Sequence, residues 1–217
     1  MSAGQRAAFH FRSSRTLHGY AKGKTAWDPA YPEVAARLRG GRLPVLDIGC
    51  GVGLLAAYLR ESGCGQAIFG IEPDEKKVLM ARNLVVPAYE NLDFAVGDAR
   101  ALPEFSGEVV ILDVLHYMDY PAQQEVLQSA ALRVAPGGRI FIRTAFKDRS
   151  WRYYATLLEE IFVRASGWIR GGRCRFPAVQ EIRAPFEALG WRIEISPMWG
   201  KTPFNSHLIE AARPVRP

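Results

Sequence analysis

A glycine-rich loop that begins with an acid offers the first chemistry in this sequence. The loop Asp47-Ile48-Gly49-Cys50-Gly51-Val52-Gly53 follows an apolar, strand-like run. Glycines here let the backbone turn sharply and let a ligand approach main-chain N–H groups at a helix N-terminus. Leu54 stands where a dinucleotide-binding loop has its third glycine, and Asp47 would repel a pyrophosphate. The loop therefore favours a ligand that presents a cation rather than a diphosphate.

Three more acids end or follow strand-like runs. Glu72 follows the run 66–71, Asp98 follows 92–96, and Asp113 ends the run 108–113. In open α/β sheets, ligands bind at the carboxyl ends of the strands, near the point where the strand order reverses. A single acid after one strand is usually a cap or turn residue. The evidence for a binding site is therefore that acids recur at the ends of successive strands.

The apolar runs alternate with helical patterns from residue 43 onward. The predicted strands are 43–48, 66–71, 92–96, 108–113 and 139–144, and the helices between them are 53–61, 74–84 and 121–134. This alternation predicts βαβ units and a mainly parallel, doubly wound sheet with helices on both faces. Two later runs, 191–195 and 206–211, add strands at the C-terminal end.

The flanking segments follow other patterns. We expect a loose basic arm, then a short helix over 28–39, so that residues 1–40 form an arm with a cap helix. Residues 149–166 have apolar residues at i, i+3, i+4 and i+7, which predicts an amphipathic helix, and 179–189 predicts another. Residues 41–217 then form the main domain, with a helical, lid-like insertion at about 146–190.

Residues 43–145 resemble the class I S-adenosylmethionine (SAM) dependent methyltransferases, and within them the small-molecule enzymes of bacteria. The resemblance rests on VLDIGCGVG, GIEPDEKK, VGDARALP, LDVLHYM and LRVAPGGRIFIRT, in that order. It implies a Rossmann-like α/β fold with a seven-stranded sheet in which the strand at 206–211 is antiparallel. The implied cofactor is SAM, leaving S-adenosylhomocysteine as the product, without a metal.

The resemblance also implies roles for the acids. Asp47 helps to bind the methionine end of the cofactor, Glu72 accepts from both ribose hydroxyls, and Asp98 accepts from the adenine amino group. Asp113 lies beside the transferring methyl. The expected cofactor site is completed by Gly49, Cys50, Gly51, Gly53, Pro73, Ala99 and Lys24. Cys50 is interpreted as a small packing side chain, and Lys24 either neutralises the cofactor carboxylate or lies on a solvated arm.

Methyl transfer from a sulfonium is an in-line displacement, so alignment and exclusion of water are the main tasks. His116, three residues past Asp113, is the predicted catalytic residue, as a general base toward an acceptor hydroxyl. The alternative is that it orients its loop through a hydrogen bond. The residues expected to contact the acceptor are Tyr20, Tyr117, Trp151, Trp199 and Asn205.

Composition narrows the class of protein. The 217 residues carry 28 Lys and Arg against 22 Asp and Glu, a net charge of +6. Residues 1–27 hold +5 and 161–180 hold +4, each without an acid, so the remainder is mildly acidic. Three cysteines without metal-ligand spacing argue against a disulfide framework or a zinc site. We find no signal peptide and no apolar run of membrane-spanning length, and expect a cytoplasmic protein.

The leading function is methylation, chiefly on oxygen, of a hydroxyl or carboxylate of a small molecule or a carrier-bound group. The four arginines of 161–180 suit an acidic carrier protein or an anionic substrate. RNA methylation is an alternative because the basic segments suit phosphate, but no NPPY-like text is present. A non-catalytic SAM-binding or membrane-surface protein is the other alternative, and the sequence does not indicate an oligomeric state.

Overall fold

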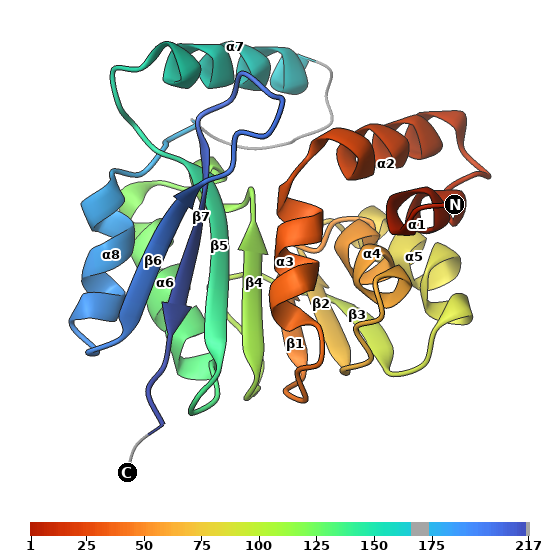
Figure 1. Cartoon of the computed structure of the whole chain (residues 1–217), viewed down its shortest axis with the longest axis horizontal. Helices are drawn as coiled ribbons and strands as arrows, with labels where there is room; N and C mark the ends of the chain where they lie inside the picture. The colour runs from red at the N-terminus through yellow and green to blue at the C-terminus, as the bar shows by residue number, and fades with distance from the viewer. Residues whose placement is uncertain (166–173, 216–217) are drawn as a thin grey trace.

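A seven-stranded sheet forms the centre of the protein, in a computed structural model that describes residues 1–165 and 174–215 (Figure 1). The strand order is β3-β2-β1-β4-β5-β7-β6. The strands are β1 (Val45–Ile48), β2 (Ile68–Glu72), β3 (Leu92–Val96), β4 (Glu108–Leu112), β5 (Arg139–Ala145), β6 (Arg192–Pro197) and β7 (Ser206–Ala212).

The first five strands are parallel, and β7 runs antiparallel to both β5 and β6. The predicted mainly parallel sheet with an antiparallel strand at 206–211 is therefore confirmed. The chain leaves β1 toward β2 on one side and returns to β4 on the other, so the order reverses between β1 and β4. Ligand sites of doubly wound sheets lie above such a reversal.

Helices cover both faces of the sheet. The helices are α1 (Ala3–Phe9), α2 (Arg15–Trp27), α3 (Ala30–Leu38), α4 (Leu54–Glu61), α5 (Glu75–Leu84), α6 (Tyr120–Arg133), α7 (Trp151–Ala165) and α8 (Val179–Glu187), with short 3-10 turns at Val86–Ala88 and Leu115–Tyr117. The apolar side chains of α1 to α5 share one core with one face of the sheet. Those of α6 and α8 form a second core against the opposite face.

Local sequence explains where these helices begin. Asp74 caps α5, its carboxylate accepting from Lys76 N at 2.9 Å, and Asp119 caps α6 by accepting from Ala122 N at 3.1 Å. Such caps satisfy N–H groups that have no partner within the helix. Pro121 lies in the first turn of α6, where its missing N–H costs nothing.

The N-terminal segment is not the loose arm that its charge pattern predicts, because residues 3–27 form two helices. Ser2 and Gln5 make a capping box at the start of α1, and Ser14 caps α2. Phe11, between the helices, has no exposed surface. Small residues allow the close crossing: a Cβ added to Gly4 would lie 2.9 Å from Thr25 Cβ. Four of the five basic residues lie on these helices and Arg12 lies in the turn between them. The helices also bury an apolar side, which the charge pattern alone does not reveal.

The two halves of the predicted insertion at 146–190 differ in position. α7 lies above the edge of the sheet where β4 ends (Figure 1), the place expected of a lid. α8 instead packs Ile182 and Phe186, both fully buried, into the second core, so it belongs to the body of the fold. Residues 166–173, between the two helices, lie outside the described part of the chain.

Candidate active site

The glycine loop after β1 has a left-handed backbone at its three glycines. Gly49, Gly51 and Gly53 have φ of 77°, 56° and 79°. A Cβ added to Gly49 would lie 2.3 Å from Val114 Cγ2, so the loop after β4 requires a glycine there. A Cβ at Gly51 would meet nothing within 4 Å. The loop therefore presents bare backbone to open space at its middle glycine.

Cys50 is a packing residue within this loop. It is buried, and its Sγ would lie 2.8 Å from a Cβ added to Gly70 on β2. Burial raises the pKa of the Cys50 thiol, and the carboxylates of Asp47 and Glu72 raise it further. A thiol held protonated in this way is a poor nucleophile, which agrees with the packing role expected from the sequence.

Two carboxylates flank the loop. Glu72 Oε2 accepts from Gly51 N at 3.1 Å, and Oε1 accepts from Asp74 N at 3.2 Å. Asp47 is buried, and its Oδ2 has no hydrogen-bond partner among the described residues. Burial raises the pKa of Asp47 to about 7, with a further contribution from Glu72. An unpaired buried carboxylate is costly, so this position suits a cationic group of a ligand.

A cavity of about 370 Å³ opens beside the loop. Five of the predicted site residues line it: Gly49, Pro73, Asp98, Ala99 and Tyr117. The other lining residues are Ile71, Gly97, Arg100, Val114, Met118, Asp119 and Ala122. Asp98 accepts from Arg100 N at 2.9 Å, and the Arg100 side chain lowers the pKa of Asp98. The structure thus brings together the carboxyl ends of β1, β2, β3 and β4, as the sequence indicates.

Four charged side chains form a cluster at the end of β4 and β5. Arg143 Nη1 contacts Asp113 Oδ2 at 2.8 Å and also donates to Asp28 Oδ2. Lys24 Nζ contacts Asp28 Oδ2 at 2.8 Å and Asp113 Oδ2 at 3.2 Å. Ser206 Oγ accepts from Arg143 Nη2 at 3.2 Å. We call Lys24, Asp28, Asp113 and Arg143 the charge cluster.

The charge cluster is balanced, with two cations and two anions. Burial alone would raise the pKa of Asp113, but Arg143 and Lys24 hold it below its usual range. Burial opposes the charge of Lys24 as well, yet Asp113 keeps the pKa of this lysine raised. Asp113 also has a φ of 59°, which is uncommon for a residue with a side chain. Strain of this kind is found where a side chain must be held in one orientation.

Asp28 and Arg143 were not predicted from the sequence. Arg143 lies inside the apolar run Arg139–Ala145 of β5 and is 6% exposed. A charged residue within a buried strand is a signal for a buried partner, and this signal was present in the sequence. Asp28 had no such signal, because it resembles an ordinary residue before a helix.

α7 directs two adjacent carboxylates toward the site. Glu159 is half-buried, and its pKa is raised to about 7, first by burial and then by Asp113 against the opposing effect of Lys24. Glu160 Oε1 lies 3.3 Å from His116 Nε2 and its carboxylate is 3.4 Å from Tyr117 Oη. The acidic side of α7 therefore faces the strand ends.

His116, the predicted general base, is 4% exposed and does not line the cavity. Its ring stacks against Phe176 at 5.3 Å between centroids, and neither ring nitrogen has a hydrogen-bond partner among the described residues. Its closest charged neighbour is Glu160. This placement ties the loop after β4 to α7. It leaves the predicted general base outside the cavity, and among the described residues it shows no ring hydrogen bond of the kind that the orienting alternative assumes.

The other predicted acceptor contacts lie in three different places. Tyr20 lies one helical turn before Lys24 on α2, on the side of the charge cluster. Asn205 is buried and donates from Nδ2 to Phe146 O at 3.0 Å and to Asp148 Oδ2 at 2.8 Å, so it fixes loops. Trp151 and Trp199 lie on the outside, with Arg152 stacked over both rings at 4.6 and 4.5 Å.

The arginine-rich run 161–180 is only partly described. Arg170 and Arg173 lie outside the described residues. Arg175 pairs with Glu181 at 2.6 Å, donates to Gln123 Oε1 at 2.8 Å and stacks over Tyr120. Arg175 is thus engaged by side chains of the fold itself.

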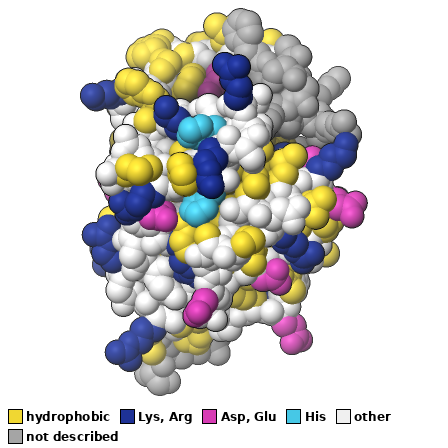
Figure 2. Space-filling model, turned by 90° about the vertical axis from the view of Figure 1, so that its right-hand side faces the viewer, with side chains coloured by type: hydrophobic (Ala, Val, Ile, Leu, Met, Phe, Trp, Pro, Cys, Tyr) yellow, Lys and Arg dark blue, Asp and Glu magenta, His cyan; other side chains and the backbone are white. Residues whose placement is uncertain are grey.

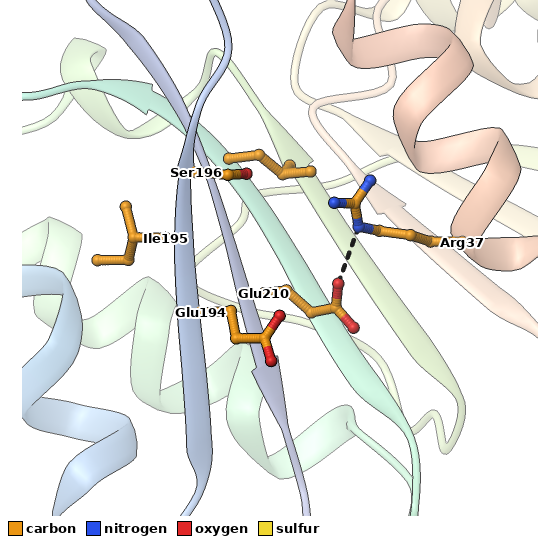
Figure 3. A pocket seen from close by; sticks show the side chains of 6 residues that line it. Arg37, Glu194, Ile195, Ser196 and Glu210 are labelled. Atoms are coloured by element: carbon orange, nitrogen blue, oxygen red, sulfur yellow. Dashed lines mark hydrogen bonds and ion pairs between the residues drawn. The ribbon is translucent and has the colours of Figure 1, made fainter.

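A second hollow of about 360 Å³ lies on the sheet surface at β6 and β7 (Figure 3). Arg37 reaches it from α3 and donates to Glu210 Oε2 at 2.9 Å. It contains none of the predicted site residues. The described residues hold no group of three His, Cys, Asp or Glu side chains that could bind a metal ion. Nor does any described helix combine the length and apolar character needed to cross a membrane.

Comparison with known proteins supports a methyltransferase site. Residues 45–138 match the family model described as "Methyltransferase domain". The magnesium protoporphyrin IX methyltransferase of Synechocystis PCC 6803, solved with bound S-adenosylhomocysteine, has a TM-score of 0.65 and 25% identity, covering 85% of this chain and 82% of that one. Residues 45–138 therefore form a methyltransferase domain that resembles those of the class I SAM-dependent enzymes. SAM is its cofactor, as the sequence indicates.

Curated relatives are more distant. The ubiquinone biosynthesis O-methyltransferase of Sinorhizobium fredii is 28% identical over 170 residues, which cover 76% of this chain and 64% of the relative. That of Coxiella burnetii is 26% identical over 125 residues, 57% of this chain and 51% of the relative. The chain thus matches under two thirds of the length of these relatives. The mitomycin 7-O-methyltransferase MmcR, at 19% identity and a TM-score of 0.70, shows the same fold.

The loop of this methyltransferase domain fits the cofactor. The open backbone at Gly51 gives room for the methionine end, and the unpaired Asp47 Oδ2 matches a donor such as the cofactor ammonium. Glu72 lies at the end of β2 with a carboxylate that can accept two hydrogen bonds. Acids near a sulfonium are favourable because the charges are opposite.

Proposed function

We propose that this chain transfers the methyl group of SAM to a hydroxyl oxygen of a small molecule. Two observations support the choice of oxygen. The curated relatives are named O-methyltransferases. The residue after β4 is Asp113, a carboxylate held ionised by two cations, and it would accept a hydrogen bond from an acceptor hydroxyl. The second observation carries the proposal.

The cofactor is held, in this proposal, by three acids at or near the carboxyl ends of β1, β2 and β3. Asp47 accepts from the ammonium, Glu72 from the ribose hydroxyls, and Asp98 from the adenine amino group. Pro73, Ala99 and Gly49 line the same cavity as Asp98 and supply its walls. When bound, SAM supplies a methyl group already activated on a sulfonium.

The charge cluster orients the acceptor. Lys24 and Arg143 both contact Oδ2 of Asp113, so the carboxylate is fixed from one side. A fixed acceptor of a hydrogen bond holds the hydroxyl in one orientation, and orientation is the main source of acceleration in a direct displacement. α2 and α7 bring Lys24 and Glu159 over the strand ends, where they exclude water from the reacting atoms.

Labelled-methyl transfer tests this function. The chain is incubated with SAM carrying a tritiated methyl group and, separately, with phenols, catechols, aromatic carboxylates, bulk RNA and an acidic acyl carrier protein bearing a hydroxyacyl group. We expect label in a phenol or catechol, lost in Asp113→Ala and kept in Asp93→Ala, which removes an exposed carboxylate of β3 that does not line the cavity. Label only in RNA or only in a carboxylate would contradict the proposal. Transfer to the carrier-bound hydroxyl would extend it to the carrier-bound acceptors considered from the sequence.

A further inference from the structure

α7 turns its apolar side outward. Trp151, Tyr154, Leu158 and Ile161 are 63%, 59%, 55% and 63% exposed. At 100° per residue these positions fall on one side of the helix, along roughly 15 Å of its length. The acids of the helix, Glu159 and Glu160, face the protein. An amphipathic helix on a globular protein normally buries its apolar side and exposes its charged side. Because α7 does the reverse, we expect its apolar side to contact another surface.

The apolar side of α7 continues onto two neighbouring segments. Arg152 stacks between Trp151 and Trp199, which joins α7 to the loop between β6 and β7. The same loop reaches the start of α3, because a Cβ added to Gly200 would lie 3.2 Å from Pro29 Cγ. Trp27, two residues before Pro29, is 63% exposed. We call Trp27, Trp151, Tyr154, Leu158, Ile161 and Trp199 the apolar edge.

The charges around the apolar edge are mainly positive. Lys147, Arg149 and Lys201 are exposed in the segments next to α7 and Trp199. The nearby acid, Asp148, is engaged by Asn205 Nδ2 and Ser150 N at 2.8 Å each. Figure 2 shows further Lys and Arg side chains on the side of the molecule formed by the N-terminal helices, with hydrophobic side chains gathered at the upper edge, where α7 lies in Figure 1.

We propose that the apolar edge is a membrane-binding surface that docks on bilayers containing anionic lipids. Tryptophan and tyrosine prefer the boundary between headgroups and acyl chains, and flanking Lys and Arg are attracted to anionic headgroups. The surface follows the end of the sheet where Asp113 lies, so a docked molecule would present its acceptor side to the bilayer. An acceptor dissolved in lipid could then enter without crossing water.

Two other occupants fit the edge less well. A second copy docked edge to edge about a two-fold axis would bring the same basic side chains, Lys147, Arg149 and Lys201, toward each other, and like charges repel. An acidic protein would have to pair with Lys and Arg, whereas the centre of this surface is tryptophan, tyrosine and aliphatic side chains. Membrane docking uses both the apolar centre and the basic border.

Vesicle flotation with the full chain tests the proposal, without SAM or an acceptor. We expect the wild type to float with vesicles of phosphatidylcholine mixed with phosphatidylglycerol, more weakly with phosphatidylcholine alone, and less at high salt. Leu158→Asp combined with Ile161→Asp should lower the vesicle partition coefficient by on the order of 10-fold or more. Leu132→Asp is the matched control, because Leu132 on α6 is 72% exposed and lies outside the apolar edge.

Thermal melting identifies any variant that fails to fold, and Trp151→Ser serves as a second variant. The proposal is overturned if the wild type does not float with anionic vesicles, or if the Leu158–Ile161 double variant floats as well as Leu132→Asp. Equal, salt-independent binding to neutral vesicles would overturn the role of the basic border. A dimer in sedimentation equilibrium that forms through the edge and does not bind vesicles would replace the membrane with a second copy.

Discussion

Lys24 Nζ lies 3.2 Å from Asp113 Oδ2, although the two residues are 89 positions apart. The contact joins the N-terminal helix α2 to the end of β4, at the edge of the sheet where the strand order reverses. The basic N-terminal segment is therefore part of the candidate active site. Its lysine and Arg143 together neutralise the two carboxylates of the charge cluster.

Replacing Lys24 by Ala should destabilise the protein and weaken the site. Asp28 and Asp113 would then share Arg143 alone. Exposed ion pairs contribute up to about 1 kcal/mol, whereas breaking a buried pair costs about 3–5 kcal/mol. Because Lys24 is partly exposed, we expect a loss of about 2 kcal/mol in the free energy of unfolding, measured by urea denaturation. Lys22→Ala, exposed on the same helix, is the control, and equal losses in both variants would refute the role of the charge cluster.

Glu159 should make the protein less stable as the pH rises. Its pKa is raised to about 7 in the folded chain, from 4.5, mainly by burial. The contribution of Glu159 to the free energy of unfolding is therefore fully present below pH about 4.5, and it is lost as the pH rises through about 7 and the buried carboxyl ionises. The difference in free energy of unfolding between Glu159→Gln and the wild type should therefore shift in favour of the variant by about 1–2 kcal/mol from pH 5 to pH 8, after discounting for solvent exposure.

Denaturation at the two pH values measures this difference. Glu160→Gln is the matched control, since the neighbouring carboxylate pairs with His116 instead of facing the charge cluster. If wild type and Glu159→Gln change in parallel between pH 5 and pH 8, Glu159 is not the group that titrates.

Asp47 should couple cofactor binding to proton release. Burial and Glu72 raise its pKa to about 7, so without a ligand it is partly protonated near neutral pH. A cationic group beside Oδ2 would stabilise the ionised form and lower this pKa. Binding of S-adenosylhomocysteine should then release protons, and its affinity should increase as the pH rises through about 7.

Calorimetry in buffers with different ionisation enthalpies counts these protons. Asp47→Asn keeps the shape of the side chain and cannot titrate, so its binding should release fewer protons. The same number of protons in both proteins would show that Asp47 does not contact the cofactor cation.

His116 should act as a positioning residue. It is buried against Phe176 and Glu160 and does not line the cavity. We expect His116→Asn to stay within about tenfold of the wild-type turnover rate, with the same pH profile, whereas loss of a general base costs roughly 10²- to 10⁴-fold. A stability cycle with Glu160→Gln should show coupling between the two side chains. If turnover instead falls at least a hundredfold, and the rising limb of the pH profile near neutrality is lost, the catalytic role is restored.

The sheet was predictable because its strands are short apolar runs between clear turns. β3 spans Leu92–Val96, as the sequence predicts, and the other strands differ by two residues or fewer at each end. The acids at or just beyond the carboxyl ends of β1, β2, β3 and β4 could be placed together because parallel strands end at the same edge. Local patterns and the ordering of motifs were sufficient for this part.

The charge cluster was not predictable in the same way. It depends on how α2 packs over the sheet, and the apolar residues that direct this packing, such as Ala7 and Ala21, are few and small. The basic residues around them suggested a solvated arm. The outward apolar side of α7 was also hidden, because periodicity shows that a helix has an apolar side and not which way that side faces.

Glu72 offers the most direct test of the central claim, that the strand ends around the glycine loop bind SAM. Its carboxylate accepts from Gly51 N and Asp74 N, and in the proposed function it also accepts from the ribose hydroxyls. Calorimetric titration of S-adenosylhomocysteine into the full chain should show one site. Glu72→Ala should lower the affinity by on the order of 10- to 100-fold, because hydrogen bonds to a charged group contribute roughly 1.5–3 kcal/mol. Glu75→Ala, three residues later on exposed α5 surface, should bind as the wild type does. No binding by the wild type, or equal affinity in Glu72→Ala and Glu75→Ala, would contradict the claim.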